Sequence, residues 1–187
     1  MKPEKIHIIG SVGSGKTTFS RRLSKRLTIA YYELDNVVWK RRENVDVHDV
    51  KRSPQERDEY FSGILNSNEW IVEGVHSGDW VMQSIQKADV IVLLDTSYFV
   101  RIHRIIRRFF LQKLGREKAN YVPSFKIFWR MFKWNHLFEK DKSEILKKIY
   151  AYNENLVILS NHKDLEKYLE EGHVHGLHNG LKETNRL

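Results

Sequence analysis

Residues 6–18 read Ile-His-Ile-Ile-Gly-Ser-Val-Gly-Ser-Gly-Lys-Thr-Thr, and this stretch decides the fold. The β-branched run before Gly10 predicts a short buried strand, and the spacing of apolar residues predicts an amphipathic helix over residues 16–27. Between them, residues 10–17 match the pattern G-x-x-x-x-G-K-[ST] in full, which indicates a phosphate-binding loop. The alternative is a glycine-rich turn that merely links strand to helix, and the match of both motif and context disfavours it.

The chemistry of phosphate binding explains the spacing of this motif. Glycines let backbone N–H groups point at a phosphate, and the helix beginning near Lys16 adds the positive end of its dipole. We expect Lys16 to reach the β and γ phosphates of a nucleoside triphosphate, and the Thr17 hydroxyl to bind Mg²⁺. The expected nucleotide-binding residues are Gly10, Ser11, Gly13, Ser14, Gly15, Lys16, Thr17 and Thr18.

Two acidic residues are candidates to support the Mg²⁺ ion. Glu73 follows a predicted strand at residues 70–72, and Asp95 follows another at residues 90–94. Both are placed at the carboxyl ends of strands, where open α/β sheets bind ligands. Asp95 fits the usual pattern of a hydrophobic run followed by Asp, but it also precedes a helix that it could cap. The alternative for either acid is an exposed strand-end residue.

A third acidic residue, Asp35, is predicted to end a second strand over residues 31–34 at the same edge of the sheet. There its carboxylate could accept a proton from the hydroxyl group of an acceptor or hold that group by hydrogen bonds. The alternative is a turn aspartate before Asn36. Trp39 and Trp80 could stack on an acceptor base or sugar, although a lone tryptophan is more often a packing residue.

The rest of the chain alternates predicted strands and helices. Further strands are expected at residues 70–72, 90–94 and 156–159, and further helices at residues 53–67, 77–86, 98–111, 124–138, 141–152 and 163–170. Residues 37–51 are expected to be irregular. Five strands that alternate with helices favour an α/β fold with a parallel sheet covered on both faces.

The composition fits one domain with a sizeable core, since 41% of the 187 residues are hydrophobic. We expect a domain over residues 1–172 and a disordered tail over residues 173–187. The absence of cysteine excludes disulfides, a thiol nucleophile and cysteine-ligated metal sites. The longest apolar run, residues 90–94, is far shorter than the about 20 residues that span a membrane, and the N-terminus lacks a signal-peptide pattern. A cytoplasmic protein is expected.

The positive charge of the chain is concentrated in one region. The whole sequence has a net charge of +8, whereas residues 98–142 contain 12 Lys and Arg against 3 Asp and Glu, a net charge of +9. Clustered cations usually meet phosphates, on a small ligand, a nucleic acid or a membrane surface. Arg101, Arg104 and Arg108 share one helix face at i, i+3 and i+7 spacing. Because these like charges repel, we expect the face to meet an anion; a solvated surface is the alternative.

A loop at residues 114–123 follows the basic helix. Gly115 permits motion there, and Arg116 is a candidate to close over a transferred phosphoryl group. The next helix carries an aromatic stripe at i, i+3, i+4 and i+7, formed by Phe125, Phe128, Trp129 and Phe132. Such a stripe usually faces the core. A nucleic-acid stacking platform or a membrane-surface helix is the alternative.

With these residues in place, the sequence resembles the adenylate-kinase-like P-loop proteins, and most of all the group called DNA topology modulation (FlaR-related) proteins. The resemblance covers about residues 5–170. It is carried by Ile8 to Thr18, Leu34-Asp35-Asn36-Val37-Val38-Trp39, Trp70-Ile71-Val72-Glu73-Gly74, and Leu93-Leu94-Asp95 followed by Arg104, Arg107 and Arg108, with a similar aromatic segment around Trp129 and Trp134. The phosphate loop is the specific element, and the others gain weight from their order and spacing.

The resemblance implies a P-loop NTPase fold, a three-layer α/β/α arrangement with a five-stranded parallel sheet in the order 2-3-1-4-5 and a helical lid over about residues 98–142. It implies ATP as the nucleotide and places the acceptor near Asp35. It also implies that Arg104 and Arg108 are the paired arginines of nucleoside-monophosphate kinases and that Arg116 is a lid arginine. In such small kinases the strand beside the phosphate loop is often the third, which favours Glu73 over Asp95 as the magnesium carboxylate, with Thr17.

The sequence also departs from these kinases. It has Glu73-Gly74 where they usually have Asp-Gly, and the Pro-Arg that follows in them is absent. Phosphorylation of AMP itself is therefore not expected. The leading hypothesis is an ATP-dependent kinase of a nucleotide- or nucleoside-like small molecule, with Lys16, Asp35, Arg104, Arg108 and Arg116 as catalytic residues. The alternatives are an ATP-regulated nucleic-acid-binding protein that affects DNA topology and binds through residues 98–142, and a simple ATPase.

Overall fold

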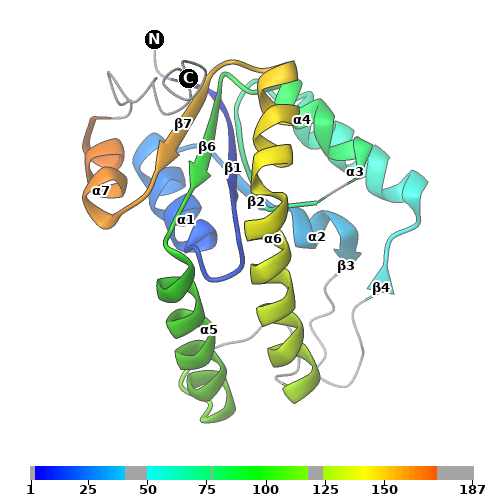
Figure 1. Ribbon diagram of the computed structural model, residues 1–187. Helices are drawn as coiled ribbons and strands as arrows, with labels where there is room; N and C mark the ends of the chain where they lie inside the picture. The colour runs from blue at the N-terminus through cyan, green and yellow to red at the C-terminus, as the bar shows by residue number, and fades with distance from the viewer. Residues whose placement is uncertain (1–2, 41–49, 77, 118–123, 172–187) are drawn as a thin grey trace.

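Five parallel strands form the central sheet of the computed structural model, which describes residues 3–40, 50–76, 78–117 and 124–171 (Figure 1). The strands are β1 (Lys5–Gly10), β2 (Tyr31–Glu33), β5 (Trp70–Glu73), β6 (Val90–Leu94) and β7 (Leu156–Leu159). Their order in the sheet is β2-β5-β1-β6-β7, and every neighbouring pair is parallel. The order expected from the sequence is confirmed, with β1 at the centre of the sheet.

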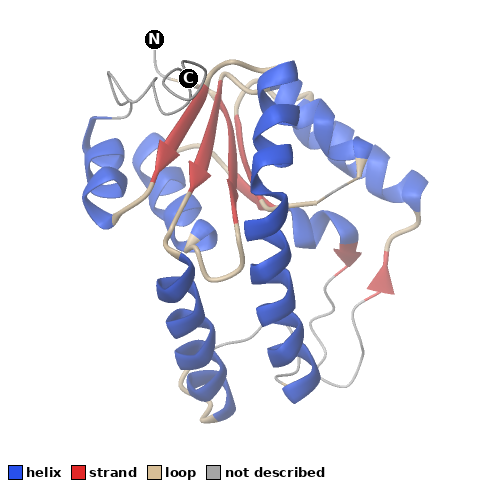
Figure 2. Cartoon of the chain, in the orientation of Figure 1, coloured by secondary structure: helices blue, strands red, loops and turns tan. Residues whose placement is uncertain are grey.

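Helices cover both faces of this sheet (Figure 2). A short antiparallel hairpin of β3 (Trp39–Lys40) and β4 (Val50–Lys51) lies outside it. The helices are α1 (Lys16–Leu27), α2 (Leu34–Val38), α3 (Pro54–Leu65), a 3-10 turn η1 (Asp79–Val81), α4 (Met82–Lys87), α5 (Tyr98–Lys113), α6 (Phe125–Tyr152) and α7 (His162–Glu171). None of the described helices is long and apolar enough to cross a membrane.

Alternation along the strands divides the core into two layers. Successive side chains of a strand point to opposite faces, so Ile8 and Ile9 of β1 enter different clusters. Ile8 packs in a cluster with Phe19 of α1 and Tyr168 of α7. Ile9 belongs to the other cluster, which takes in residues of α2, α3, α4 and α6, among them Phe138. The predicted three-layer α/β/α arrangement is therefore confirmed.

The start of α3 is set by the local sequence, as predicted. The Ser53 hydroxyl accepts a hydrogen bond from the Glu56 backbone N–H at 3.2 Å, and the Glu56 carboxylate accepts one from the Ser53 N–H at 2.9 Å. Pro54 follows at the first helical position, where its missing N–H has no helical partner to lose. This capping box satisfies two backbone donors at once.

The largest error of the sequence prediction concerns α6. Two helices were expected, with a new one beginning at Asp141, but a single helix runs from Phe125 to Tyr152. Phe138 and Ile149 are both buried, so one apolar stripe continues through the expected break. Lys142 forms an ion pair with Asp95 at 2.6 Å, which holds this part of the helix against the end of β6. Tertiary packing therefore overrides the local capping signal.

Two smaller corrections concern the segments after β2 and β5. Leu34 does not extend the second strand, because α2 begins there and places Asp35 in its first turn. The segment expected to be irregular contains α2, β3 and β4, while residues 41–49 lie outside the described residues. The short helix expected over residues 77–86 is a 3-10 turn followed by α4. The expected tail, residues 173–187, also lies outside the described part of the chain.

Helices α5 and α6 pack against each other and form what we call the helical hairpin, residues 98–117 and 124–152. Figure 1 shows α5 and the first half of α6 running side by side beyond the carboxyl ends of the strands. The hairpin therefore begins at the edge of the sheet where the phosphate loop lies and extends away from it.

Candidate functional site

The phosphate loop joins β1 to α1 in a conformation that requires glycine. Gly13 and Gly15 have φ angles of 78° and 96°, in the left-handed region that residues with a side chain rarely adopt. A Cβ atom on Gly13 would also lie 2.8 Å from the backbone oxygen of Arg101 in α5. Gly15 is the N-cap of α1, and no side chain caps this end. The first-turn N–H groups therefore have no side-chain acceptor, as an anion site requires.

Lys16 lies over this loop. Its Nζ atom donates a hydrogen bond to the Ser11 backbone oxygen at 3.1 Å. Burial lowers the pKa of Lys16, and the negative charges of Glu73 and Asp35 oppose that shift. The two acids thus stabilise a charged ammonium group where phosphates would bind.

Thr17 and Glu73 meet beside Lys16. The Thr17 hydroxyl donates to the Glu73 Oε1 atom at 2.6 Å, and Glu73 is only 4% exposed. The contact follows from the sheet, because β5 pairs with β1 and places Glu73 opposite Ile8. Asp95 lies elsewhere, in its ion pair with Lys142. A hydroxyl and a carboxylate are oxygen ligands of the kind that Mg²⁺ takes in phosphoryl-transfer sites, together with phosphate oxygens.

Asp35 has a neighbour that the sequence prediction missed. The His76 Nε2 atom lies 3.3 Å from Asp35 Oδ1, which joins the loop after β5 to the first turn of α2. Gly74 permits this approach, because a Cβ atom at its φ of 145° would lie 2.8 Å from the Leu34 Cβ atom. The small residue after Glu73 was visible in the sequence, but nothing local indicated that the histidine beyond it would reach α2.

The two tryptophans considered for acceptor stacking differ in environment. Trp80 packs on Phe61 with ring centroids 5.1 Å apart, and its ring also lies under the Arg57 guanidinium at 4.7 Å. It is therefore part of the packing between α3 and the turn before α4. Trp39 is 38% exposed in β3. A cavity of about 210 Å³ lies near Asp35, lined by Tyr31, Tyr32, Glu33, Asn36, Val37 and Tyr60.

The arginines of α5 divide into different environments. Arg104 donates through NH1 to the Ser14 backbone oxygen at 3.0 Å, so it covers the phosphate loop. Arg108 acts electrostatically on Lys16 and pairs with Glu117 at 3.4 Å. Arg101 is fully buried and forms an ion pair with Glu139 of α6. The arginine face predicted from the sequence thus contacts the loop through the Arg104 side chain, whereas the Arg101 side chain pairs with Glu139 between the two helices of the hairpin.

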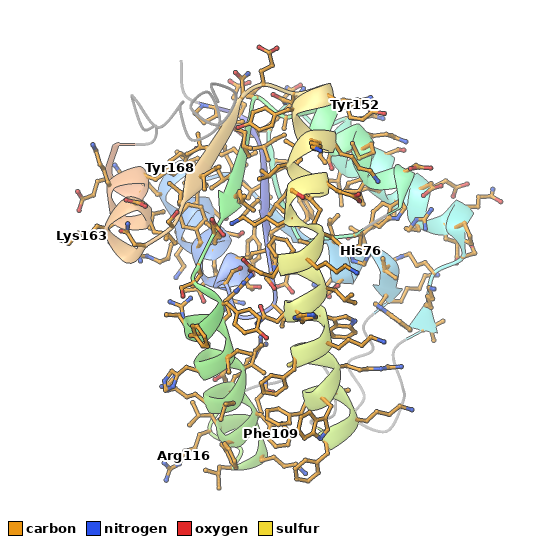
Figure 3. All side chains as sticks on the ribbon, viewed as in Figure 1. His76, Phe109, Arg116, Tyr152, Lys163 and Tyr168 are labelled. Atoms are coloured by element: carbon orange, nitrogen blue, oxygen red, sulfur yellow. The ribbon has the colours of Figure 1, made fainter. Side chains whose placement is uncertain are left out.

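Arg116 is not brought to the phosphate loop in this structure. It is exposed and follows the end of α5, at the tip of the hairpin (Figure 3). Its backbone N–H donates to the Leu111 oxygen at 2.9 Å, which closes the turn after the helix.

The aromatic stripe of α6 was expected to face the core, and this is only partly right. Phe128 stacks on Phe109 of α5 with ring centroids 4.4 Å apart, so the stripe packs within the hairpin rather than against the sheet. Phe125 and Trp129 are 65% and 68% exposed. The buried residues of this part of α6 lie on another stripe, which includes Met131, Asn135 and Phe138.

Asn135 also contacts the phosphate loop, which the sequence did not predict. It is fully buried, and its Oδ1 atom accepts a hydrogen bond from the Ser11 hydroxyl at 3.0 Å. Thr96, just after β6, makes a further contact by donating to the Ser14 oxygen at 3.1 Å. The i, i+4, i+7 spacing of Met131, Asn135 and Phe138 was the available signal, since it places an amide on an otherwise apolar face.

Comparison with known proteins adds relatives of two kinds. The chain is 29% identical over 141 residues to the uncharacterized protein YqaC of Bacillus subtilis, with 75% of each protein covered. It is 26% identical over 148 residues to a shikimate kinase of Flavobacterium johnsoniae, which covers 71% of this chain and 86% of the relative.

Solved structures agree on the fold. A shikimate kinase from Acinetobacter baumannii in complex with shikimate has a TM-score of 0.52 at 14% identity, with 88% of each chain covered. A shikimate kinase from Bacteroides thetaiotaomicron has a TM-score of 0.51 at 14% identity, covering 88% of this chain and 93% of that one. At this identity the likeness concerns the fold alone. A family model described as AAA domain (AAA_18) matches residues 6–109, more than half of the sequence, and the chain therefore belongs to this family of P-loop, kinase-like domains.

Proposed function

We propose that this protein is an ATP-dependent kinase that transfers the γ-phosphoryl group of ATP to a hydroxyl group of a small, nucleotide- or nucleoside-like acceptor. The observation that carries the proposal is the contact between Thr17 and Glu73 at 2.6 Å beside the half-buried Lys16, at a helix end that no side chain caps. The kinase-like fold supports it.

Residues 10–18 would hold the phosphates, with backbone N–H groups of the loop and the end of α1 pointing at them. Lys16 would leave the Ser11 oxygen for the β and γ phosphates. Thr17 and Glu73 would hold Mg²⁺, which supplies positive charge that stabilises the transferring group.

Asp35 and His76 belong on the acceptor side of this proposal. The acceptor oxygen attacks the γ phosphorus, the bond to the β–γ bridging oxygen breaks, and its electrons go to ADP. The proton of the acceptor hydroxyl passes to the Asp35 carboxylate, which His76 orients at 3.3 Å. Arg104 and Arg108 stabilise the charge on the phosphoryl oxygens.

We also propose that residues 1–172 form the kinase domain, that residues 98–142 act as its lid and that the enzyme works in the cytoplasm. The contact of Arg104 with the phosphate loop supports a role of the hairpin in covering the nucleotide. Arg116 would join the site when the hairpin moves toward the sheet, since it now lies at the tip.

The test is a screen for acceptor-stimulated ADP release with ATP and Mg²⁺. The acceptors are nucleosides, nucleotides and small hydroxy compounds, with shikimate included because of the relative. At least one acceptor should raise ADP release well above the rate without acceptor and yield a phosphorylated product. ADP release that no acceptor changes would instead identify an ATPase. Calorimetry that finds no ATP·Mg²⁺ binding would overturn the nucleotide site itself.

A second candidate function is nucleic-acid binding by the helical hairpin, as in an ATP-regulated protein that affects DNA topology. Exposed aromatic rings among cations favour it: Trp129, Phe125 and Phe110 are 68%, 65% and 59% exposed, in a region of net charge +9. Binding to single-stranded DNA should then weaken by decades as salt rises, because phosphate contacts release counterions. Lys16→Ala should leave that affinity largely intact, whereas it should lower kinase turnover about 10²–10³-fold.

A further inference from the structure

We propose that Asn135, on the long helix α6, is a positioning residue of the phosphate loop and couples nucleotide binding to the helical hairpin. The inference rests on the proposed nucleotide site and extends it to a residue outside the segment matched by the family model, which ends at residue 109. The phosphate loop is thereby held by the hairpin as well as by its own glycines.

The position of Asn135 is unusual for an amide. It is fully buried, on a helix stripe with the buried Met131 and Phe138. Burying an amide in apolar surroundings is unfavourable unless its polar atoms are hydrogen-bonded. Its Oδ1 atom has such a bond from the Ser11 hydroxyl, 124 residues away in sequence. The amide is thus explained by the loop that it holds.

Ser11 links Asn135 to the lysine of the site. The Ser11 backbone oxygen accepts the Lys16 Nζ hydrogen bond, while the Ser11 hydroxyl donates to Asn135. When a triphosphate draws Lys16 away, the Ser11 oxygen loses this hydrogen bond and keeps the one from the Ser14 backbone N–H at 3.2 Å. The hydrogen bond to Asn135 then remains as the side-chain contact that holds the Ser11 hydroxyl.

A second observation points the same way. The Asn135 Nδ2 atom is buried and has no hydrogen-bond partner among the described residues. A buried donor without a partner is unfavourable, so the contact with Ser11 must offset the cost of keeping an amide at this position. The carbonyl that Lys16 leaves belongs to Ser11, the residue that Asn135 already contacts. We expect this oxygen to become the acceptor of the Nδ2 donor when a nucleotide is bound.

An ion pair links the two helices of the hairpin close to this contact. Glu139 lies one turn after Asn135 on α6 and pairs with Arg101 of α5, whose backbone oxygen lies against Gly13. Both helices of the hairpin thus contact the phosphate loop, α6 at Ser11 and α5 at Gly13. A change in the loop is transmitted to both helices through these contacts.

The test measures ATP·Mg²⁺ affinity by calorimetry in the unchanged chain and in six variants, which include the single variant Ser11→Ala. Asn135→Ala should weaken affinity about five- to tenfold, the equivalent of one buried hydrogen bond. Asn135→Asp keeps an acceptor for Ser11 but removes the donor and adds negative charge, so it should weaken affinity at least as much. The double variant Ser11→Ala/Asn135→Ala should bind no more weakly than the weaker of the two single variants. His136→Ala changes an exposed neighbour and should bind normally.

Asn135→Leu separates positioning from folding. Leucine suits the apolar stripe, so the thermal midpoint should be kept or raised, while ATP·Mg²⁺ affinity should still fall about five- to tenfold. Normal affinity in Asn135→Ala or Asn135→Leu, or losses that multiply in the double variant, would overturn the role of Asn135. Absence of binding in the unchanged chain would overturn the proposed function instead, so the two failures are distinguishable.

Discussion

The phosphate loop and the helical hairpin meet at the same edge of the sheet but are built differently. The loop is local, because Ser11 and Lys16 contact each other across five residues and two glycines fix the backbone. The hairpin reaches the loop from far along the chain, as Arg104 does at Ser14, and its other end exposes aromatic rings. The conformation of the loop thus depends on consecutive residues, whereas its contacts with the hairpin depend on side chains from distant parts of the chain.

The largest effect is expected from removing the lysine of the loop. Lys16→Ala should lower the rate of acceptor-dependent ADP release about 10²–10³-fold, because one preorganised donor to the transferring phosphate is lost. A coupled assay for ADP measures it. Lys133→Ala, an exposed cation of the hairpin, is the matched control and should keep the rate. Equal losses in both variants would show that the hairpin is as essential to the chemistry as the loop.

A smaller effect is expected where the two regions touch. Arg104→Ala should reduce kcat about 10²-fold, with less change in KM for ATP, if its guanidinium moves from the loop carbonyls to the phosphoryl group. Arg107, on the exposed face of the same helix, is the control, and Arg107→Ala should leave kcat unchanged. Steady-state kinetics at saturating acceptor decide between them. Unchanged kcat in Arg104→Ala would restrict this arginine to holding the loop.

Variants of Glu73 and Asp95, the two acids at the carboxyl ends of β5 and β6, should differ in how their activity depends on magnesium. Glu73→Gln should raise the Mg²⁺ concentration for half-maximal rate about 10- to 100-fold, because the carboxylate beside Thr17 is lost. Asp95→Asn should instead lower the thermal midpoint, since it removes the ion pair to Lys142, and keep the magnesium dependence. A magnesium titration of both variants is the measurement. A stronger magnesium requirement in Asp95→Asn than in Glu73→Gln would reverse the assignment.

The smallest expected effect is a pH dependence of stability in β1. Burial lowers the pKa of His7 to about 4, against an opposing contribution from the Gly74 backbone. The unfolded chain, with a pKa of 6.5, therefore binds this proton first, and the stability contributed by neutral His7 is present above pH 6.5 and lost as pH falls toward 4. We expect the free energy of unfolding to fall by about 1–2 kcal/mol between pH 7 and pH 5.

Urea unfolding at both pH values measures this loss. His7→Gln should remove it, whereas His136→Gln, at an exposed position of the hairpin, should retain it. The Ser84 hydroxyl donates to the Val81 oxygen at 2.7 Å, so the His7 Nδ1 atom donates to Ser84 at 2.9 Å. In the neutral ring the proton is therefore on Nδ1. A loss of the same size in His7→Gln would assign the pH dependence to other groups.

Much of the fold was predictable because its signals are local. The β-branched runs at β1 and β6 and the capping box at Ser53 all mark elements that the structure contains. The break expected in α6 was wrong because the buried positions Phe138 and Ile149 and the Lys142 ion pair continue the helix through Asp141. Local capping chemistry stabilises a helix end by about 1 kcal/mol, less than the packing of a long apolar face.

The phosphate loop could be predicted from consecutive residues alone, since glycines suit the left-handed backbone at positions 13 and 15 and Lys16 follows them directly. The acid that contacts Thr17 became known from the packing of the strands, which brings Glu73, and not Asp95, beside that hydroxyl. The tertiary structure also brings His76 to Asp35 and Asn135 to Ser11. The physical reason is that such contacts depend on how distant elements pack, and side-chain spacing along one element carries no information about its neighbour.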